Sequence, residues 1–309
     1  MLVSLIIGLF SFSCIILFVI FSSSCVPETK NAVLMFLNTV LPTMFPFYVL
    51  SSIIASSGFL TYICKPLKPL TNRILKLPAC CIAAIVLGCL CGFPVGAKIT
   101  CDLKERGDIS EEEAARLSSF TNNVGPIFMT SIVGGVYLKS SQIGFILWLA
   151  VTLSSFLSGF LICHFRRNSS MVDLSGEIST SVNKIDIPAS ILSSMNTVLY
   201  VGAVIIFFSS VTSLLKIIPG ISENIYGIFY SFLEITGGLN ILSKIFHPDY
   251  IILKYMLLSA VGAWSGCSVH IQVCGILLSG KISTRYYFAG KILQTLLSPL
   301  IVFLIFAII

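Results

Sequence analysis

The chain has 309 residues, of which 56% are apolar and 10% charged, and its formal net charge at pH 7 is +6. With a mean hydropathy of +0.99, this composition excludes an ordinary soluble globular domain. Loop lysines and arginines orient the helices of membrane proteins, so the net charge implies no nucleic-acid partner. We therefore expect an all-α polytopic membrane protein with the lipid bilayer as its main partner.

The first apolar stretch covers residues 1–30. No basic residue precedes its apolar run, and that run is longer than the core of a signal peptide, which predicts a retained transmembrane helix. Most of the eleven cysteines lie inside apolar runs, and no CxxC pair indicates a metal or redox site. We expect neither a metal nor a cofactor.

The two halves of the chain share residues at a nearly fixed spacing. An offset of 173 pairs Pro126 with Pro299, and an offset longer by one residue places Gly92 on Gly266. This pattern predicts an internal repeat, which we expect to be inverted. The predicted domains are an N-terminal helix at 1–30, a first repeat at 31–164, a polar linker at 165–188 and a second repeat at 189–309.

Each predicted half contains a glycine-rich break inside an apolar stretch. In "ACCIAAIVLGCLCGFPVGAKITCDLKERG" about 13 residues precede the Gly-Pro-Gly break, too few to cross a bilayer. This predicts a re-entrant helical hairpin over 79–106, and "SAVGAWSGCSVHIQVCGILLSGK" predicts a second one over 251–280. Backbone groups freed at membrane depth need protein or a water-filled cavity around them, so both breaks point to a cavity. The alternative is that the glycines only permit close helix packing.

A third irregularity is "SSFTNNVGPIF", in which two asparagines precede a glycine and a proline. Pro126 frees a backbone carbonyl near Asn122, which predicts a discontinuous helix over 112–138 facing the hairpins. The alternative is a kinked helix whose amides bond to neighbouring helices.

Two ionisable residues stand out in apolar surroundings. Glu234 is a site residue if its segment lies within the membrane, and a wetted interfacial residue if the segment lies at the surface. His270 is either a proton-linked ligand or a neutral imidazole bonded to a neighbouring helix. We expect 218–246 to be an amphipathic arm; if it spans instead, both hairpins enter from the cytoplasm, as the positive-inside rule prefers.

Five stretches together carry a resemblance to one protein family. "LPTMFPFYVLSSI", "GFPVGAKIT", "EEAARLSSFTNNVGPIF", "FLEIT" and "WSGCSVHIQVCGIL" resemble the YlbJ-like sporulation integral membrane proteins, which carry the nucleoside-recognition or Gate domain. The resemblance implies a multi-pass protein of the bacterial cytoplasmic membrane, in the forespore or the mother cell, that is needed for spore cortex formation. It also implies a fold similar to concentrative nucleoside transporters, in which two re-entrant hairpins and two unwound helices surround one substrate site.

The breaks and this correspondence together define the candidate substrate-binding residues. The carboxylates that hold ribose in the hairpins of those transporters are missing here, so the solute is expected to be a small polar molecule, nucleoside-like or cell-wall-related. Coupling to an ion or a proton and a homo-oligomeric state stay open. The candidates are Gly92, Pro94, Gly96, Lys98, Asn122, Asn123, Glu234, Ser265, Gly266, Ser268, His270 and Gln272.

Three classes of function can be considered for these candidate residues. A protein that translocates or binds a small solute is the first, and a non-transporting scaffold or signalling partner in spore assembly is the alternative. An enzyme needs a nucleophile, a base and an orienting acid in one place. The chain has three histidines, and two of them, His164 and His247, lie at predicted membrane edges. We therefore do not expect an enzyme.

Overall fold

The computed structural model describes residues 2–57, 59, 62, 66, 69–165, 186–217, 223–245 and 248–308. Within these residues all regular structure is helical. Five helical stretches are long and apolar enough to cross a membrane, which confirms the predicted all-α polytopic class. They are Ser22–Ser56, Ser141–His164, Ile187–Ser213, Ile251–Ser279 and Arg285–Ile308.

The N-terminal region forms two helical stretches where the sequence predicted one helix over 1–30. The chain turns at Phe21, whose backbone angles (φ −108°, ψ 30°) are not helical. Phe21 is the last residue of the apolar run and is followed by three serines, so the turn lies where the hydropathy falls. The elements are α1 (Leu2–Ile20), followed by α2 (Ser22–Met35), the π-helical segment η1 (Phe36–Val40) and α3 (Leu41–Ser56), which continue one another as one long helix.

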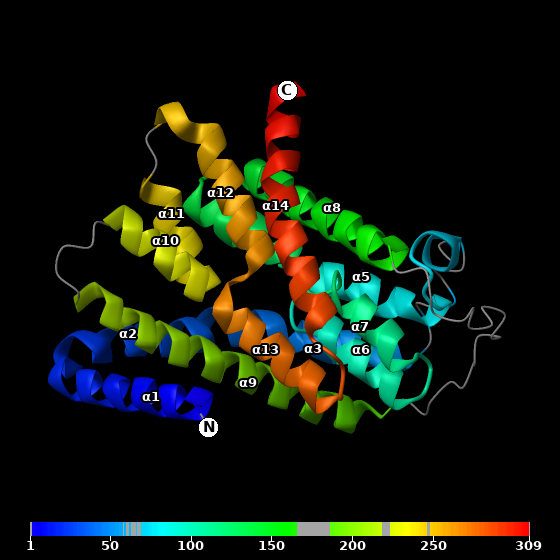
Figure 1. Cartoon of the computed structure of the whole chain (residues 1–309), viewed down its shortest axis with the longest axis horizontal. Coiled ribbons are helices and arrows are strands. Elements are labelled where there is room, and N and C mark those ends of the chain that lie inside the picture. Colours follow the sequence, from blue (N-terminus) through cyan, green and yellow to red (C-terminus); the bar gives the residue numbers. More distant parts are fainter. Residues whose placement is uncertain are drawn as a thin grey trace.

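The segment 79–106 folds into a pair of short helices. The 3-10 turn η4 (Ala79–Cys81) leads into α5 (Ile82–Cys91), and residues 92–94 connect it to α6 (Val95–Glu105). The two helices pack against each other (Figure 1), and the Cys80 thiol donates to the Asp108 carbonyl at the open end of the pair (3.7 Å). The first hairpin, α5–α6, therefore has its tip at 92–94 and its open end near the charged loop.

The second pair of helices that fold back on each other lies at 223–245. Here α10 (Glu223–Leu233) and α11 (Ile235–Ile245) lie side by side around Glu234 (Figure 1). Gly237 and Gly238 leave room for Tyr230 and Ser231, so the two helices can approach closely. The expected arm at 218–246 is therefore a helical hairpin, α10–α11, in its described residues.

The segment 251–280 does not form the hairpin that was predicted for it. After the 3-10 turn η7 (Pro248–Tyr250), α12 (Ile251–Trp264) and α13 (Gly266–Ser279) follow one another and do not pack side by side (Figure 1). Left-handed backbone at Ser265 (φ 76°) and Gly266 (φ 80°) interrupts the helix without reversing its course. This stretch is a discontinuous helix, long enough to span the membrane as one unit.

These elements give the two halves the same order, in a different pairing from the predicted offset of 173. A long helix is followed by a hairpin, a discontinuous helix and another long helix, first from α3 to α8 and then from α9 to α14. In this order of elements, the hairpin at 79–106 and the helix pair at 223–245 hold the same position. The remaining elements are η3 (Leu70–Ile74), α7 (Glu111–Ser118), η5 (Phe128–Tyr137), α8 (Ser141–Phe165), α9 (Ile187–Ser213), η6 (Leu214–Ile217) and α14 (Arg285–Ile308).

Most of the predicted linker, residues 166–185, lies outside the described residues. The end of the predicted linker is already helical, because α9 begins at Ile187. The Asp186 side chain accepts a hydrogen bond from the backbone N–H of Ala189 (2.9 Å) and so caps this helix.

The ends of α6 and α13 lie at the same end of the molecule. The ammonium of Lys104, in the last turn of α6, donates to the carbonyls of Gly280 (2.9 Å) and Lys281 (2.8 Å) just beyond α13. The charged ends of 79–106 and 251–280 therefore lie on the same side, whereas two re-entrant hairpins joined by a non-spanning arm at 218–246 would place them on opposite sides. The prediction from sequence took the break at Ser265 for a reversal of the chain. It therefore placed residue 280 on the opposite side of the membrane.

This arrangement predicts the sidedness of three exposed positions. In a background without native cysteines, we expect Glu105→Cys and Lys281→Cys to react with a membrane-impermeant thiol reagent from the same side. Lys244→Cys should react from the opposite side, because the interrupted helix α12–α13 crosses the membrane between Lys244 and Lys281. Labelling of intact cells and of inverted vesicles measures this, and opposite sidedness of Glu105→Cys and Lys281→Cys contradicts the fold.

Candidate functional site

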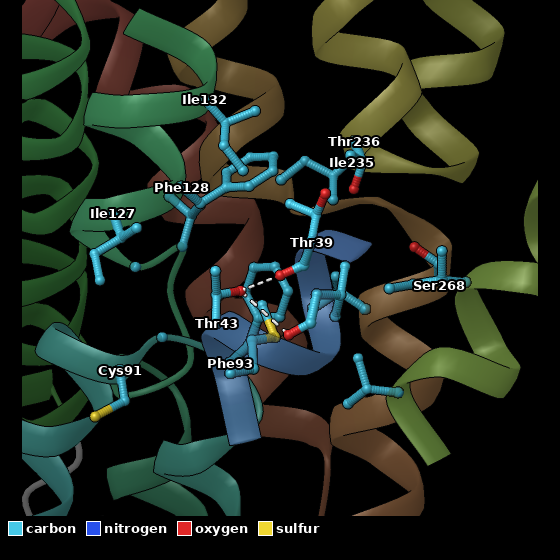
Figure 2. Close-up of a pocket in the computed structure, with 18 of the residues that line it drawn as sticks. Thr39, Thr43, Cys91, Phe93, Ile127, Phe128, Ile132, Ile235, Thr236 and Ser268 are labelled. Atoms are coloured by element: carbon cyan, nitrogen blue, oxygen red, sulfur yellow. Dashed lines mark hydrogen bonds between the residues drawn. The ribbon is translucent and has the colours of Figure 1, made fainter. Parts of the chain in front are cut away.

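A cavity of about 310 Å³ lies where the tips of both hairpins meet. The long N-terminal helix, the segment after α7 with η5, the helix α9 and the first turns of α13 also contribute to its wall, part of which Figure 2 shows. Three interruptions of helical structure that are far apart in the sequence, at 92–93, 124–125 and 234, thus contribute to one space. The lining includes Cys91, Gly92, Phe93, Val124, Gly125, Glu234, Ile235, Thr236, Ser268, Val269 and Gln272.

Two polar side chains of α13 face this cavity with unused hydrogen-bonding capacity. Ser268 and Gln272 are one turn apart, and each is only 1% exposed. The Ser268 hydroxyl oxygen and the Gln272 carbonyl oxygen have no hydrogen-bond partner among the described residues. No side chain caps the N-terminus of α13. Because buried polar atoms are normally paired, these groups point to a bound molecule that pairs with them.

Glu234 lines the cavity at the tip of the second hairpin. Its carboxylate accepts hydrogen bonds from the backbone N–H groups of Thr236 (2.9 Å) and Gly237 (2.7 Å) at the start of α11. The positive end of the helix dipole favours a negative charge at this position. Glu234 is 1% exposed, so it is a buried capping residue at the cavity and not a wetted interfacial residue.

Two threonines of the N-terminal helix also line the cavity, and the sequence analysis did not single them out. Thr39 and Thr43 are one turn apart, and the Thr43 hydroxyl donates to the Thr39 carbonyl (2.6 Å). Figure 2 places Thr39 among Phe128, Ile235 and Ser268. Threonines four residues apart in an apolar helix share one face, and this spacing was the available signal.

The tip of the first hairpin touches the non-helical segment that follows α7. Gly92 has φ 80°, and a side chain there would lie 2.7 Å from the backbone nitrogen of Gly125. The next residue, Phe93, donates its N–H to the Asn123 carbonyl (2.8 Å). Gly92 therefore serves both expected purposes, a left-handed turn and close packing, whereas Gly96 packs against the Thr121 carbonyl.

Asn122 holds the first hairpin in place from outside the cavity. Its side-chain oxygen accepts from the N–H of Ala97 (2.7 Å), in the first turn of α6, and its amide nitrogen donates to the Ser118 carbonyl (3.1 Å). Asn123 donates its side-chain N–H to the Phe120 carbonyl (2.7 Å). The helix is interrupted as predicted at 122–125. The Asn122 oxygen bonds to a neighbouring helix, whereas the two amide nitrogens bond within their own segment and the Asn123 side-chain oxygen has no partner among the described residues.

His270 is likewise part of the packing between helices. Its Nδ1 lies 2.8 Å from the Tyr287 hydroxyl of α14, and its ring contacts Trp264 edge-on (centroid distance 4.3 Å). The side chain is buried and does not line the cavity. This geometry is that of the alternative interpretation, an imidazole bonded to a neighbouring helix.

The cavity therefore gathers a third of the predicted residues. Gly92, Glu234, Ser268 and Gln272 line it, whereas Pro94, Gly96, Lys98, Asn122, Asn123, Ser265, Gly266 and His270 do not.

The role of Asn122 can be tested by stability alone. We expect Asn122→Ala to lower the free energy of unfolding by about 1–3 kcal/mol, because it leaves a buried N–H and a buried carbonyl without a partner. Asn196→Ala, which removes an exposed amide from α9, is the matched control and should change the free energy little. Denaturation in detergent micelles measures both variants; equal stability of the two would contradict a capping role.

The chain is similar to the sporulation integral membrane protein YlbJ of Bacillus subtilis (strain 168). The two are 27% identical over 315 aligned residues, which cover 90% of this chain and 76% of that protein. This similarity confirms the resemblance to YlbJ-like sporulation integral membrane proteins and, with the membrane-length helices, the multi-pass location in the cell membrane. No family model matches the chain, and no solved structure matches it significantly.

Proposed function

We propose that this chain, whose similarity to a YlbJ protein supports a role in sporulation, binds a small polar solute and translocates it across the membrane. The observation that supports this most directly is the convergence of two hairpin tips and an interrupted helix on one cavity. Secondary transporters bind their solutes in this way, between discontinuous helices near the middle of the bilayer. We assign no catalytic step to the protein.

The repeated order of elements supports the same proposal. We propose that the chain contains an inverted repeat in which the hairpins α5–α6 and α10–α11 are re-entrant and enter from opposite faces of the membrane. The concentrative nucleoside transporters, which the sequence motifs resemble, pair two such hairpins with two unwound helices. In this proposal the unwound helices are α7 with η5, and α12 with α13.

The chemistry of the cavity narrows the class of solute. Its volume of about 310 Å³ lies at the small end of the range for small-molecule sites. Most of its lining is apolar, no lysine or arginine is among its lining residues, and the Glu234 carboxylate is engaged by backbone N–H groups. A neutral solute with an apolar face and a hydrogen-bonding edge, such as a nucleoside-like molecule, fits these features better than an anionic cell-wall precursor. We place this activity in spore formation, following the name of the relative.

Solute accumulation in vesicles tests the proposal. Vesicles that contain the purified protein are incubated with a small-molecule extract of sporulating bacteria, and the retained solutes are identified by mass spectrometry. We expect at least one neutral solute to accumulate above the level in protein-free vesicles. Gln272→Leu should reduce this accumulation by about 10-fold, because it removes the unpaired oxygen while it preserves the side-chain volume.

The matched control is Gln142→Leu, which makes the same replacement at an exposed position of α8 and should leave accumulation unchanged. If no solute accumulates with the wild-type protein, the alternative of a non-transporting scaffold or signalling partner is favoured. If a solute accumulates and Gln272→Leu retains it fully, transport takes place at another site.

A further inference from the structure

A lysine is buried in α14 beside the interruption of the second discontinuous helix. Lys291 is 1% exposed, and its ammonium nitrogen lies 3.1 Å from the Ala263 carbonyl oxygen and 3.1 Å from the Ser265 hydroxyl oxygen. Within the described residues, no carboxylate forms an ion pair with it. A charged side chain inside a membrane is costly unless it is paired or bound to backbone carbonyls, so these two oxygens are its stabilising partners.

Both partners of Lys291 belong to the end of a half-helix. The Ala263 carbonyl is one of the last of α12, where helical carbonyls have no partner within the helix and carry a partial negative charge. Ser265 has left-handed backbone angles, which are unfavourable for a residue other than glycine and persist only when the surroundings fix them. The ammonium thus fixes both the end of α12 and the turn into α13.

The same helix reaches the other interruption with an uncharged group. Gln294, one turn beyond Lys291, donates its side-chain N–H to the Ser119 carbonyl (2.8 Å) just after α7. It is fully buried, as Lys291 is. The helix α14 therefore donates a hydrogen bond to a helix end at each interruption. The donor is a neutral amide at the first interruption and a cation at the second.

The oxygens around the ammonium are of the kind that bind dissolved cations. In transporters with discontinuous helices, half-helix C-termini and unwound carbonyls coordinate the coupling ion. We propose that the ammonium of Lys291 is a tethered cation, which occupies a monovalent-cation site between α12 and α14 and holds the α12–α13 interruption without a dissolved metal ion. This inference concerns how the cavity wall is held and does not depend on the solute or on transport.

Titratable groups reach this interruption from both hairpin and helices. His270 of α13 and Tyr287 of α14 are hydrogen-bonded to each other (2.8 Å), and Cys267 lies in the first turn of α13. The backbone nitrogen of Glu234 lies beside Gly266, and the Glu234 carboxylate is engaged by the N–H groups of Thr236 and Gly237. The interruption directly precedes Ser268 on α13, so the position of Lys291 bears on the wall of the cavity.

Replacement of the tether by free cations tests the proposal. Lys291→Ala should leave an empty cation site, so we expect methylammonium chloride to raise the melting temperature of this variant by about 2–4 °C or more relative to choline chloride at equal ionic strength. Sodium chloride should act in the same direction. The wild-type protein should show no difference between these salts, because its site is already filled.

Gln294→Ala is the matched control, since it removes a buried donor to a half-helix end on the same helix but leaves no cation site. It should be destabilised without any specific response to methylammonium. Lys291→Met, which fills the space with an uncharged chain, should also be destabilised and unresponsive. Equal responses of Lys291→Ala and Gln294→Ala to methylammonium, or wild-type stability of Lys291→Met, would overturn the proposal.

If Lys291→Ala fails to fold in ordinary buffer, the same comparison is made during purification. Recovery of folded protein only in the presence of methylammonium or sodium supports a cation site. Failure to fold in all three salts overturns it. Solute accumulation is not a readout in any of these experiments, so the outcome is independent of the function proposed above.

Discussion

The fold depends on the docking of each hairpin tip onto the interruption of the helix that follows it in the chain. At the first interruption the Phe93 N–H bonds to the Asn123 carbonyl, and at the second the Trp264 indole N–H bonds to the Phe232 carbonyl (3.3 Å). Backbone polar groups that leave a helix at membrane depth must find partners within the protein. Each hairpin tip and the interruption that it contacts therefore form hydrogen bonds with some of each other's free polar groups.

This docking also explains where the cavity lies and what lines it. Both tips contribute residues to the cavity, and the rest of its wall comes from the N-terminal helix, η5, α9 and α13. Most polar groups near the interruptions are consumed by the docking, as Asn122 and Glu234 illustrate. Ser268 and Gln272 keep unpaired oxygens at the cavity, whereas Asn123 and Gln294, whose side-chain oxygens are also unpaired among the described residues, do not line it.

The helix α14 connects the two interruptions. Lys291 and Gln294 lie one turn apart and donate hydrogen bonds to the ends of α12 and α7. A displacement of α14 would therefore alter the hydrogen bonds at both helix ends. The close packing of α14 against α12 and α8 fixes the position of these two donors. Neither residue was singled out from the sequence, because each lies in an apolar helix far along the chain from its partner.

The sequence by itself determined the membrane class, the all-helical architecture and the interruptions near Gly92, Asn122 and Ser265. Composition and hydropathy depend only on residues that are close in the sequence. The glycines and prolines near Gly92 and Pro126 interrupt a helix through their own backbone conformation, so these effects are also local. Only the tertiary structure decided whether the chain reverses at an interruption. It reverses at Glu234 and continues at Ser265, because the double glycine after Glu234 admits a neighbouring helix whereas Lys291 holds α12 and α13 in succession. The site residues could likewise not be identified from the sequence alone. Ser268 and Gln272 face a cavity whose other walls come from distant segments. The interactions that build those walls leave no local signal in the sequence.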